Sequence, residues 1–190
     1  MVWVLVAILA IALAAAAVVL LRQRRSQQLR EGFGPEYERT IAETGDRREA
    51  ESELAERRER RSKLEIRELD PEARERYAER WRAAQRTFVD QPAAAVGEAD
   101  RLVAEVMHER GYPVEEDFER RAADVSVDHP VVVENYRAAH AISTRAVRDE
   151  ASTEDLRQAL VHFRALFAEL LGGDDEVEQR DRDDVKEIKR

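Results

Sequence analysis

The chain has 190 residues, of which 43% are hydrophobic and 38% charged, with a net charge of −9. This length leaves room for one domain with appendages. The sequence contains no cysteine, which excludes a disulfide framework, a cysteine zinc site and a thiol nucleophile. Segment 70–172 carries 21 acidic residues against 14 arginines, and such an acidic surface repels phosphate backbones. We therefore expect no nucleic acid partner.

Segment 1–21 is predicted to be a transmembrane anchor. Residues 2–21 are all apolar, and a helix of that length spans roughly 30 Å, the thickness of the hydrocarbon core of a bilayer. A cleaved signal peptide is the alternative, because the alanines at 14–17 resemble a cleavage site. The anchor is favoured because no basic residue precedes the apolar run and because residues 18–21 continue it beyond the alanines.

Four arginines directly after this run predict its orientation. Arg22, Arg24, Arg25 and Arg30 lie within ten residues of its end, and the positive-inside rule keeps such a flank in the cytoplasm. Trp3 at the opposite end suits the outer interface. We therefore expect a single-pass protein of the cell membrane, N-out, with a cytoplasmic C-terminal domain. The arginines can also rest on anionic lipid headgroups.

Segment 22–69 is predicted to be a basic juxtamembrane stretch followed by a charged helical spacer. Gly34 and Pro35 favour the start of a short helix that ends at Gly45, and Asp46 opens a second, almost wholly charged helix. The favoured interpretation is a solvated single helix, and a coiled-coil partner is the alternative. Glutamates placed four residues before a base support it, at Glu53 and Arg57, Glu56 and Arg60, and Glu59 and Lys63.

Segment 70–172 has the dense apolar periodicity of a compact bundle of about four helices, so the predicted fold class is all-α. Its helices are expected to start at Asp70-Pro71, Pro92, Pro130 and the capping-box pattern Ser152-x-x-Asp155. A short acidic helix is expected around 115–124. No stretch alternates with period two, which disfavours strands. Segment 173–190, with eight acidic and five basic residues, is predicted to be a disordered tail. The apolar stripes are Tyr77, Trp81, Ala84 and Phe88; Val96, Ala99, Leu102, Val103, Val106 and Met107; Val132, Tyr136, Ala139, Ser143 and Val147; and Leu156, Leu160, Phe163, Phe167 and Leu170.

Four stretches carry a family resemblance: FGPEYER, TFVDQP, EADRLVAEVMHERGYP and SVDHPVVVENYRAAHAI. Together they resemble an uncharacterised family of small, single-span membrane-anchored proteins from GC-rich bacteria. The resemblance covers most of the chain between the anchor and the tail. It implies a bacterial membrane setting, and it implies no activity or catalytic residue.

No strong catalytic motif is present, since the sequence has no phosphate-binding glycine loop, nucleophile elbow or zinc-protease signature. Its four histidines are His108, His129, His140 and His162, and none has another at the i+3 or i+4 spacing that places two ligands on one helix face. We therefore expect no metal site, no cofactor and no enzyme activity.

The densest polar group in the sequence comprises Asp128, His129, Asn135, Tyr136, Arg137 and His140. The favoured interpretation is structural, with Asp128 capping the helix that His129-Pro130 begins and with buried hydrogen bonds beyond it. Tyr136 and His140, four residues apart, share one helix face. The alternative is a partner or ligand site, in which Arg137 pairs with an acidic partner.

Two classes of function follow from this sequence. A tethered helical domain that presents a surface to an unidentified protein partner at the inner face of the membrane is favoured, because no nucleophile and base are paired in a motif. The alternative is a ligand sensor or an enzyme that uses the Asp128–His140 cluster.

Overall fold

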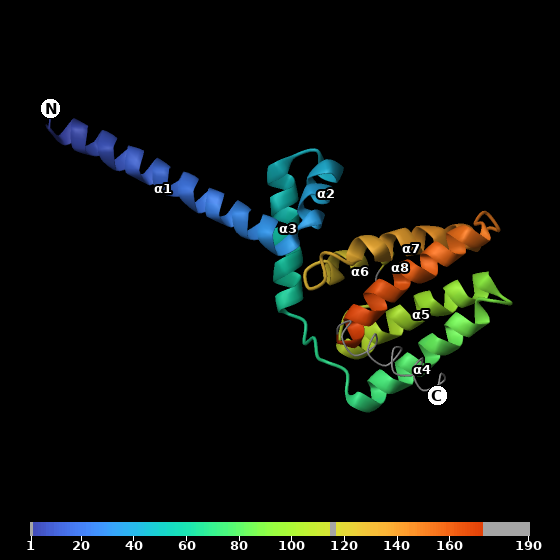
Figure 1. Ribbon diagram of the computed structural model, residues 1–190. Helices are drawn as coiled ribbons and strands as arrows, with labels where there is room; N and C mark the ends of the chain where they lie inside the picture. The colour runs from blue at the N-terminus through green and yellow to red at the C-terminus, as the bar shows by residue number, and fades with distance from the viewer. Residues whose placement is uncertain (1, 115–116, 173–190) are drawn as a thin grey trace, which may run out of the picture. The chain divides into compact units, whose positions relative to one another are not determined.

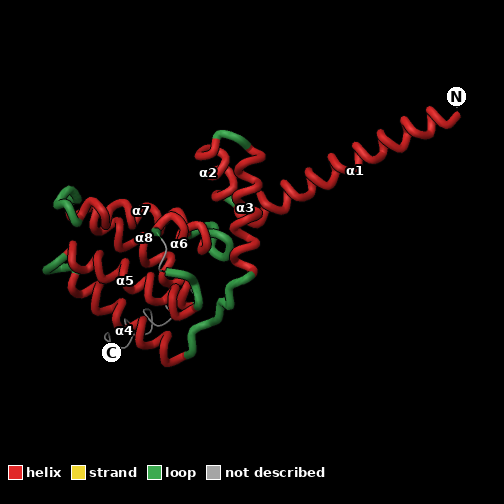
Figure 2. The backbone as a smooth tube through the Cα atoms, turned by 180° about the vertical axis from the view of Figure 1, so that it is seen from behind, coloured by secondary structure: helices red, strands yellow, loops and turns green. Residues whose placement is uncertain are grey.

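The computed structural model describes residues 2–114 and 117–172, and every element assigned in these ranges is a helix (Figures 1 and 2). Within the first part of the first helix, side chains are described only at residues 3, 13, 15–17 and from 19 onward. The predicted all-α class is confirmed, whereas the predicted tail, 173–190, lies outside the described residues. The helices are α1 (Val2–Phe33), α2 (Pro35–Thr44), α3 (Arg47–Ser62), α4 (Pro71–Thr87), α5 (Pro92–Arg110), α6 (Phe118–Val125), α7 (Val133–Ala146) and α8 (Thr153–Leu171).

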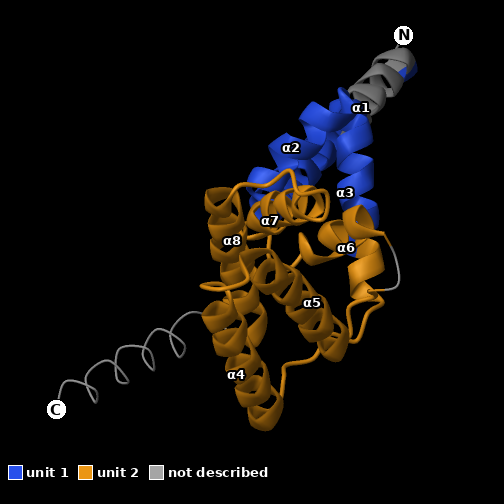
Figure 3. Ribbon diagram, turned by 90° about the vertical axis from the view of Figure 1, so that its right-hand side faces the viewer, with its two compact units in different colours: residues 1–58 blue, residues 59–190 orange. Residues whose placement is uncertain are grey.

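The chain divides into two compact units, residues 1–58 and 59–190 (Figure 3). The first unit holds α1, α2 and most of α3, and the second holds the end of α3 together with α4 to α8. The sequence had instead indicated a boundary near residue 70.

Helix α1 runs without interruption from the apolar run into the basic flank and beyond it. Within the part of the chain that the structure describes, no helix is both long and apolar enough to cross a membrane. Most side chains of the predicted anchor fall outside that description.

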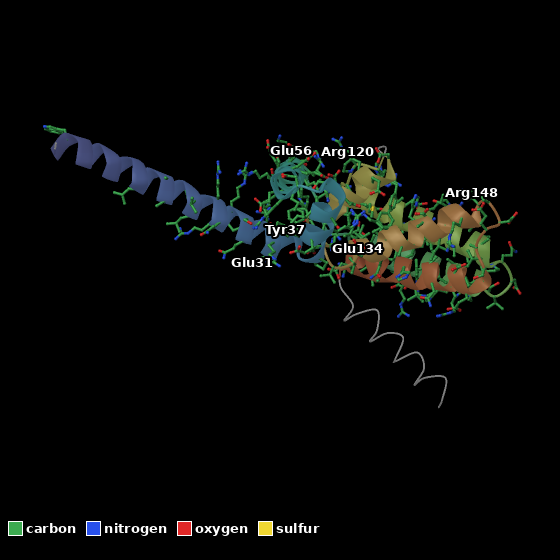
Figure 4. All side chains as sticks on the ribbon, turned by 90° about the horizontal axis from the view of Figure 1, so that it is seen from above. Glu31, Tyr37, Glu56, Arg120, Glu134 and Arg148 are labelled. Carbon is green, nitrogen blue, oxygen red and sulfur yellow. The ribbon has the colours of Figure 1, made fainter. Side chains whose placement is uncertain are left out.

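The first unit has a small core of its own, where α2 and α3 pack on the C-terminal end of α1. Leu29 and Phe33 of α1, Tyr37 of α2, and Ala50 and Leu54 of α3 are all buried. Figure 4 shows Tyr37 where these three helices come together. The prediction of a solvated single-helix spacer is therefore wrong, because the buried apolar residues of α3 share a core with apolar residues that lie 13 or more positions earlier in the chain.

A buried ion pair also holds the first unit together. Glu36, in the first turn of α2, is fully buried and accepts a hydrogen bond of 2.8 Å from the Arg57 guanidinium of α3. A second arginine, Arg39, lies 3.4 Å from the same carboxylate oxygen. Arg57 also bonds Glu53, one turn before it. Because a buried carboxylate is costly without partners, this pair fixes α2 against α3.

The second unit is the predicted bundle, with α4, α5, α8 and α7 side by side in that order (Figure 1). Its core contains most of the residues that the sequence periodicity had assigned to it, and Trp81 of α4 stacks on Phe167 of α8 at 4.6 Å between ring centroids. Of the predicted stripes, only Phe88, Val132 and Leu160 are partly buried and Val147 is exposed. The sequence therefore predicted most of this core, but not the exposure of Val147.

Local signals set most helix ends in the bundle. The Asp70 carboxylate accepts a hydrogen bond from the Ala73 amide at the start of α4, and Ser152 and Asp155 form the predicted capping box of α8. Gly111 ends α5 with φ at 99°, where a Cβ atom would lie 2.5 Å from the Glu65 carbonyl oxygen. Only glycine fits that site, because the conformation is left-handed and the backbone is close.

Candidate functional site

Asp128 does not cap α7, which corrects the first part of the predicted cluster. The helix begins at Val133, three residues after Pro130, and no side chain caps it. Asp128 instead accepts a hydrogen bond of 2.5 Å from the Tyr112 hydroxyl and one from Arg61. The carboxylate thus ties the turn after α6 to two earlier segments, which sequence spacing could not reveal.

Two further members of the cluster contact α8. The His129 Nδ1 atom lies 3.2 Å from a Glu169 carboxylate oxygen, and the Asn135 side-chain oxygen lies 2.9 Å from the His162 Nδ1 atom. Burial lowers the pKa of His129, and the hydrogen bond with Glu169 opposes that shift only in part. His129 is therefore a packed, neutral side chain at neutral pH.

Tyr136 and His140 do share one face of α7, as predicted, and that face is covered by Phe118 of α6. The Phe118 ring stacks on His140 with centroids 3.7 Å apart, and it lies 4.8 Å from the Tyr136 ring. His140 also approaches Asp100 of α5 at 3.5 Å. Since Tyr136 is fully buried, this face serves the contact between helices.

Arg137, to which the sequence interpretation gave an exposed role, is only 10% exposed in its side chain. Its guanidinium lies 3.7 Å from Glu119 of α6 and 3.7 Å from Glu134, one turn earlier (Figure 4 labels Glu134). The acidic groups that Arg137 faces belong to its own chain. The six residues thus point to several different neighbours and do not converge on one site.

Catalysis and metal binding need several polar side chains that point to one place, and this region has little of that kind. Among the described residues, no three His, Cys, Asp or Glu side chains are grouped so that they could hold a metal ion. The polar side chains of the cluster contact other parts of the bundle. This agrees with the structural interpretation of the cluster, except that Asp128 does not cap α7.

The four arginines that follow the apolar run of α1 have different surroundings. Arg22, Arg24 and Arg25 are exposed, and Arg30 forms an ion pair with Glu38 of α2 at 2.9 Å. Trp3, at the start of α1, is 86% exposed. Arg30 therefore differs from the other three arginines, because Glu38 of the same unit already neutralises its charge.

Arg22 and Arg25 line a pocket of about 520 Å³ between α1 and the start of α3. The pocket is largely open to solvent. Four arginines and a single glutamate give the pocket a strongly positive lining. The lining residues are Arg22, Gln23, Arg25, Ser26, Arg47, Arg48, Glu51 and Ser52. We call this the basic pocket.

A hydrogen-bond network forms one side of the basic pocket. The Glu51 carboxylate accepts hydrogen bonds from Ser26 at 2.7 Å, from Tyr37 at 2.8 Å and from Arg47 at 2.9 Å. Partial burial opposes ionisation of Glu51, but these three donors outweigh it and lower the pKa of the carboxyl group. Glu51 is therefore a carboxylate at neutral pH, and it satisfies Arg47.

Sequence reasoning missed the pocket because Arg47 and Arg48 lie more than 20 residues after Arg22 and Arg25. One local signal was available: two arginines open α3, although the positive end of the helix dipole disfavours cations there. The i+4 contact with Glu51 explains Arg47 but not Arg48.

Family models, curated proteins and solved structures were compared with this chain, and none of them matches it.

Proposed function

We propose that this protein is a single-pass, membrane-anchored helical module, and that it works as a protein-interaction or scaffolding element at the inner face of a bacterial membrane. Residues 2–21 are its anchor. The second unit is the part that meets a protein partner. The bacterial setting comes from the family resemblance of the four motifs.

One observation carries this proposal: twenty apolar residues pass directly into an arginine flank within one continuous helix. A helix of this length matches the hydrocarbon core. The positive-inside rule then orients the flank toward the cytoplasm, N-out, with everything after residue 21 on the cytoplasmic side.

The interaction role is favoured over a sensor or an enzyme by the state of the Asp128–His140 cluster. Its side chains contact neighbours within the bundle, and both Tyr136 and Arg137 are largely covered. The cluster therefore offers no group of side chains that converge on a ligand, whereas catalysis needs a nucleophile or base beside a cavity.

Membrane insertion is tested by fractionation and reporter fusions in a bacterial host. The full chain should stay with membranes after carbonate washing, and a chain without residues 2–21 should be released. A periplasm-dependent reporter fused after Arg190 should be inactive. Release of the full chain would contradict the anchor, and a strongly active reporter would contradict the orientation.

The interaction role is tested by crosslinking in native membranes with the full chain as bait. We expect a protein partner whose capture needs residues 59–172 but survives removal of residues 173–190. The matched control is a chain in which residues 59–190 are deleted while the anchor and first unit remain. If that control captures the same proteins as the full chain, the bundle is not the interacting part.

A further inference from the structure

We propose that the basic pocket binds the phosphate group of an anionic lipid headgroup. The inference rests on the proposed membrane anchor, because the anchor brings the pocket to the lipid surface. It goes beyond a general attraction between arginines and lipids, since it assigns one defined site with three binding side chains: Arg22, Arg25 and Arg48.

These three guanidinium groups have no partner in the part of the chain that the structure describes. Among the described residues, the side chains of Arg22, Arg25 and Arg48 form no hydrogen bond or ion pair, whereas most arginines of the first unit do. Arg30 pairs with Glu38, and Arg57 pairs with Glu36. Three free cations that line one pocket repel one another, and a bound anion relieves that repulsion.

The scaffold beneath the pocket is fixed. Arg22 and Arg25 are three residues apart and so lie on one face of α1. The network of Ser26, Tyr37, Arg47 and Glu51 joins that face to the start of α3, which carries Arg48. Because Glu51 is occupied by its own donors, it leaves the three other arginines uncompensated.

The position of the pocket along α1 matches the depth of lipid headgroups. Arg22 follows the last apolar residue, and Arg25 lies about 6 Å from Leu21 at ~1.5 Å per residue. Each headgroup layer is roughly 5–8 Å thick, from the difference between the whole bilayer and its hydrocarbon core. With residues 2–21 in the hydrocarbon core, both guanidinium groups therefore lie at the level of the phosphates.

The donor set selects for phosphate. Guanidinium groups present planar pairs of N–H donors that match phosphate oxygens, and such charge-assisted hydrogen bonds are stronger than neutral ones. A zwitterionic headgroup brings a cation beside its phosphate, which the positive lining disfavours. The same chemistry would accept free inorganic phosphate, so the experiment separates these two sources.

The test is a calorimetric titration of the purified full chain in neutral maltoside micelles. Three probes are used: dioctanoyl phosphatidylglycerol, dioctanoyl phosphatidylcholine and inorganic phosphate. We expect saturable binding of phosphatidylglycerol at one site, with at least tenfold weaker binding of the other two. Tighter binding of inorganic phosphate would overturn the headgroup assignment, and equal binding of both lipids would show that anionic charge is not selected.

Variants locate the binding in the pocket. Arg48→Gln should weaken phosphatidylglycerol binding about fivefold, as expected for one basic residue at an anionic lipid surface. The triple change of Arg22, Arg25 and Arg48 to Gln should weaken it at least tenfold. Arg24→Gln is the matched control, because Arg24 is exposed on the same helix turn but does not line the pocket. If Arg24→Gln costs as much as Arg48→Gln, the attraction is general and the site is refuted.

The experiments distinguish a protein without the lipid-binding site from a protein without the membrane anchor. The titration in micelles needs no insertion into a bilayer, and carbonate washing of cell membranes needs no pocket. Retention in membranes without selective lipid binding would overturn the pocket alone. Circular dichroism of each variant, unchanged from the native chain, shows that lost binding does not come from unfolding of the first unit.

Discussion

The two compact units of this protein are held together by different kinds of contact. In the second unit, four long helices bury a continuous apolar core that includes Trp81, Met107 and Phe163. Among the side chains that the structure describes in the first unit, few apolar ones are buried, and a fully buried Glu36 with its partner Arg57 lies among them. One unit is built on a continuous apolar core, and the other combines a small apolar core with a buried ion pair and a polar network.

The two kinds of contact respond differently to substitution. Apolar burial is non-directional and tolerates change of similar volume. A buried ion pair is directional, and the loss of one partner leaves the other charge uncompensated. A single change at Glu36 or Arg57 should therefore disrupt the first unit, which also holds three arginines without a described partner around the basic pocket.

The largest effect is expected in the apolar core. Trp81→Ala should destabilise a purified fragment of residues 59–172 by about 3–5 kcal/mol, because it empties a large buried site that is stacked on Phe167. Chemical denaturation measures the change. Gln85→Ala, exposed on the same helix, is the control and should change little. A loss below about 1 kcal/mol would mean that Trp81 is not part of the core.

The buried ion pair should give the next largest effect. Arg57→Ala should destabilise the first unit by about 3 kcal/mol, at the lower end for a broken buried pair, because Arg39 still lies near Glu36. Hydrogen exchange of the full chain in neutral micelles should show lost protection in α2 and α3. Glu56→Ala, exposed on α3, is the control. Equal protection in the Arg57→Ala and Glu56→Ala variants would show that the buried ion pair does not stabilise the first unit.

The boundary of the second unit gives a third test. A fragment of residues 59–172 should be more stable than one of residues 70–172 by about 2 kcal/mol, the scale of burying one leucine. The longer fragment adds buried Leu69 and the hydrogen bond from the Arg67 amide to the Arg110 carbonyl. Leu69→Ala in the longer fragment should remove most of the gain. Two fragments with the same denaturation midpoint would restore the boundary at residue 70.

A smaller effect is expected at the turn before α7. Asp128→Ala should cost about 1 kcal/mol, the net value of a hydrogen bond at a partly exposed site. Tyr112→Phe should add little in the Asp128→Ala background, because both changes remove the same bond. Should amides of the first turn of α7 lose more protection than the rest of the fragment, Asp128 would be a cap after all.

The smallest effect is a pH dependence of the second unit. Because burial lowers the pKa of His129 in the folded state, the unfolded chain binds its proton more readily, and stability should fall as the pH drops below about 6.5. Titration by NMR should give His129 a midpoint below that value. Glu169→Gln should lower the midpoint further, since the Glu169 hydrogen bond raises it. A midpoint above 6.5 would show that His129 is not buried as a neutral group.

The sequence alone determined the all-α fold class and most of the helix ends and buried residues of the second unit. Helix starts at Asp70 and Ser152, the stop at Gly111 and the buried stripes of α4, α5 and α8 are local or periodic signals, which depend on residues only a few positions apart. The composition also excluded cysteine chemistry. The apolar run with its arginine flank is another local signal, and the membrane anchor that it predicts is a proposal still to be tested.

The tertiary structure decided which partners the charged side chains take. Arg57 could be paired with Glu53 from spacing alone, but its contact with Glu36 crosses from α3 to α2. The local composition of the turn before α7 predicts that Asp128 is a cap, yet Tyr112 and Arg61 donate hydrogen bonds to its carboxylate. The basic pocket depends in the same way on the crossing of α1 and α3. Charged side chains are long and find partners across the fold, and no periodicity in the chain records which partner lies nearest.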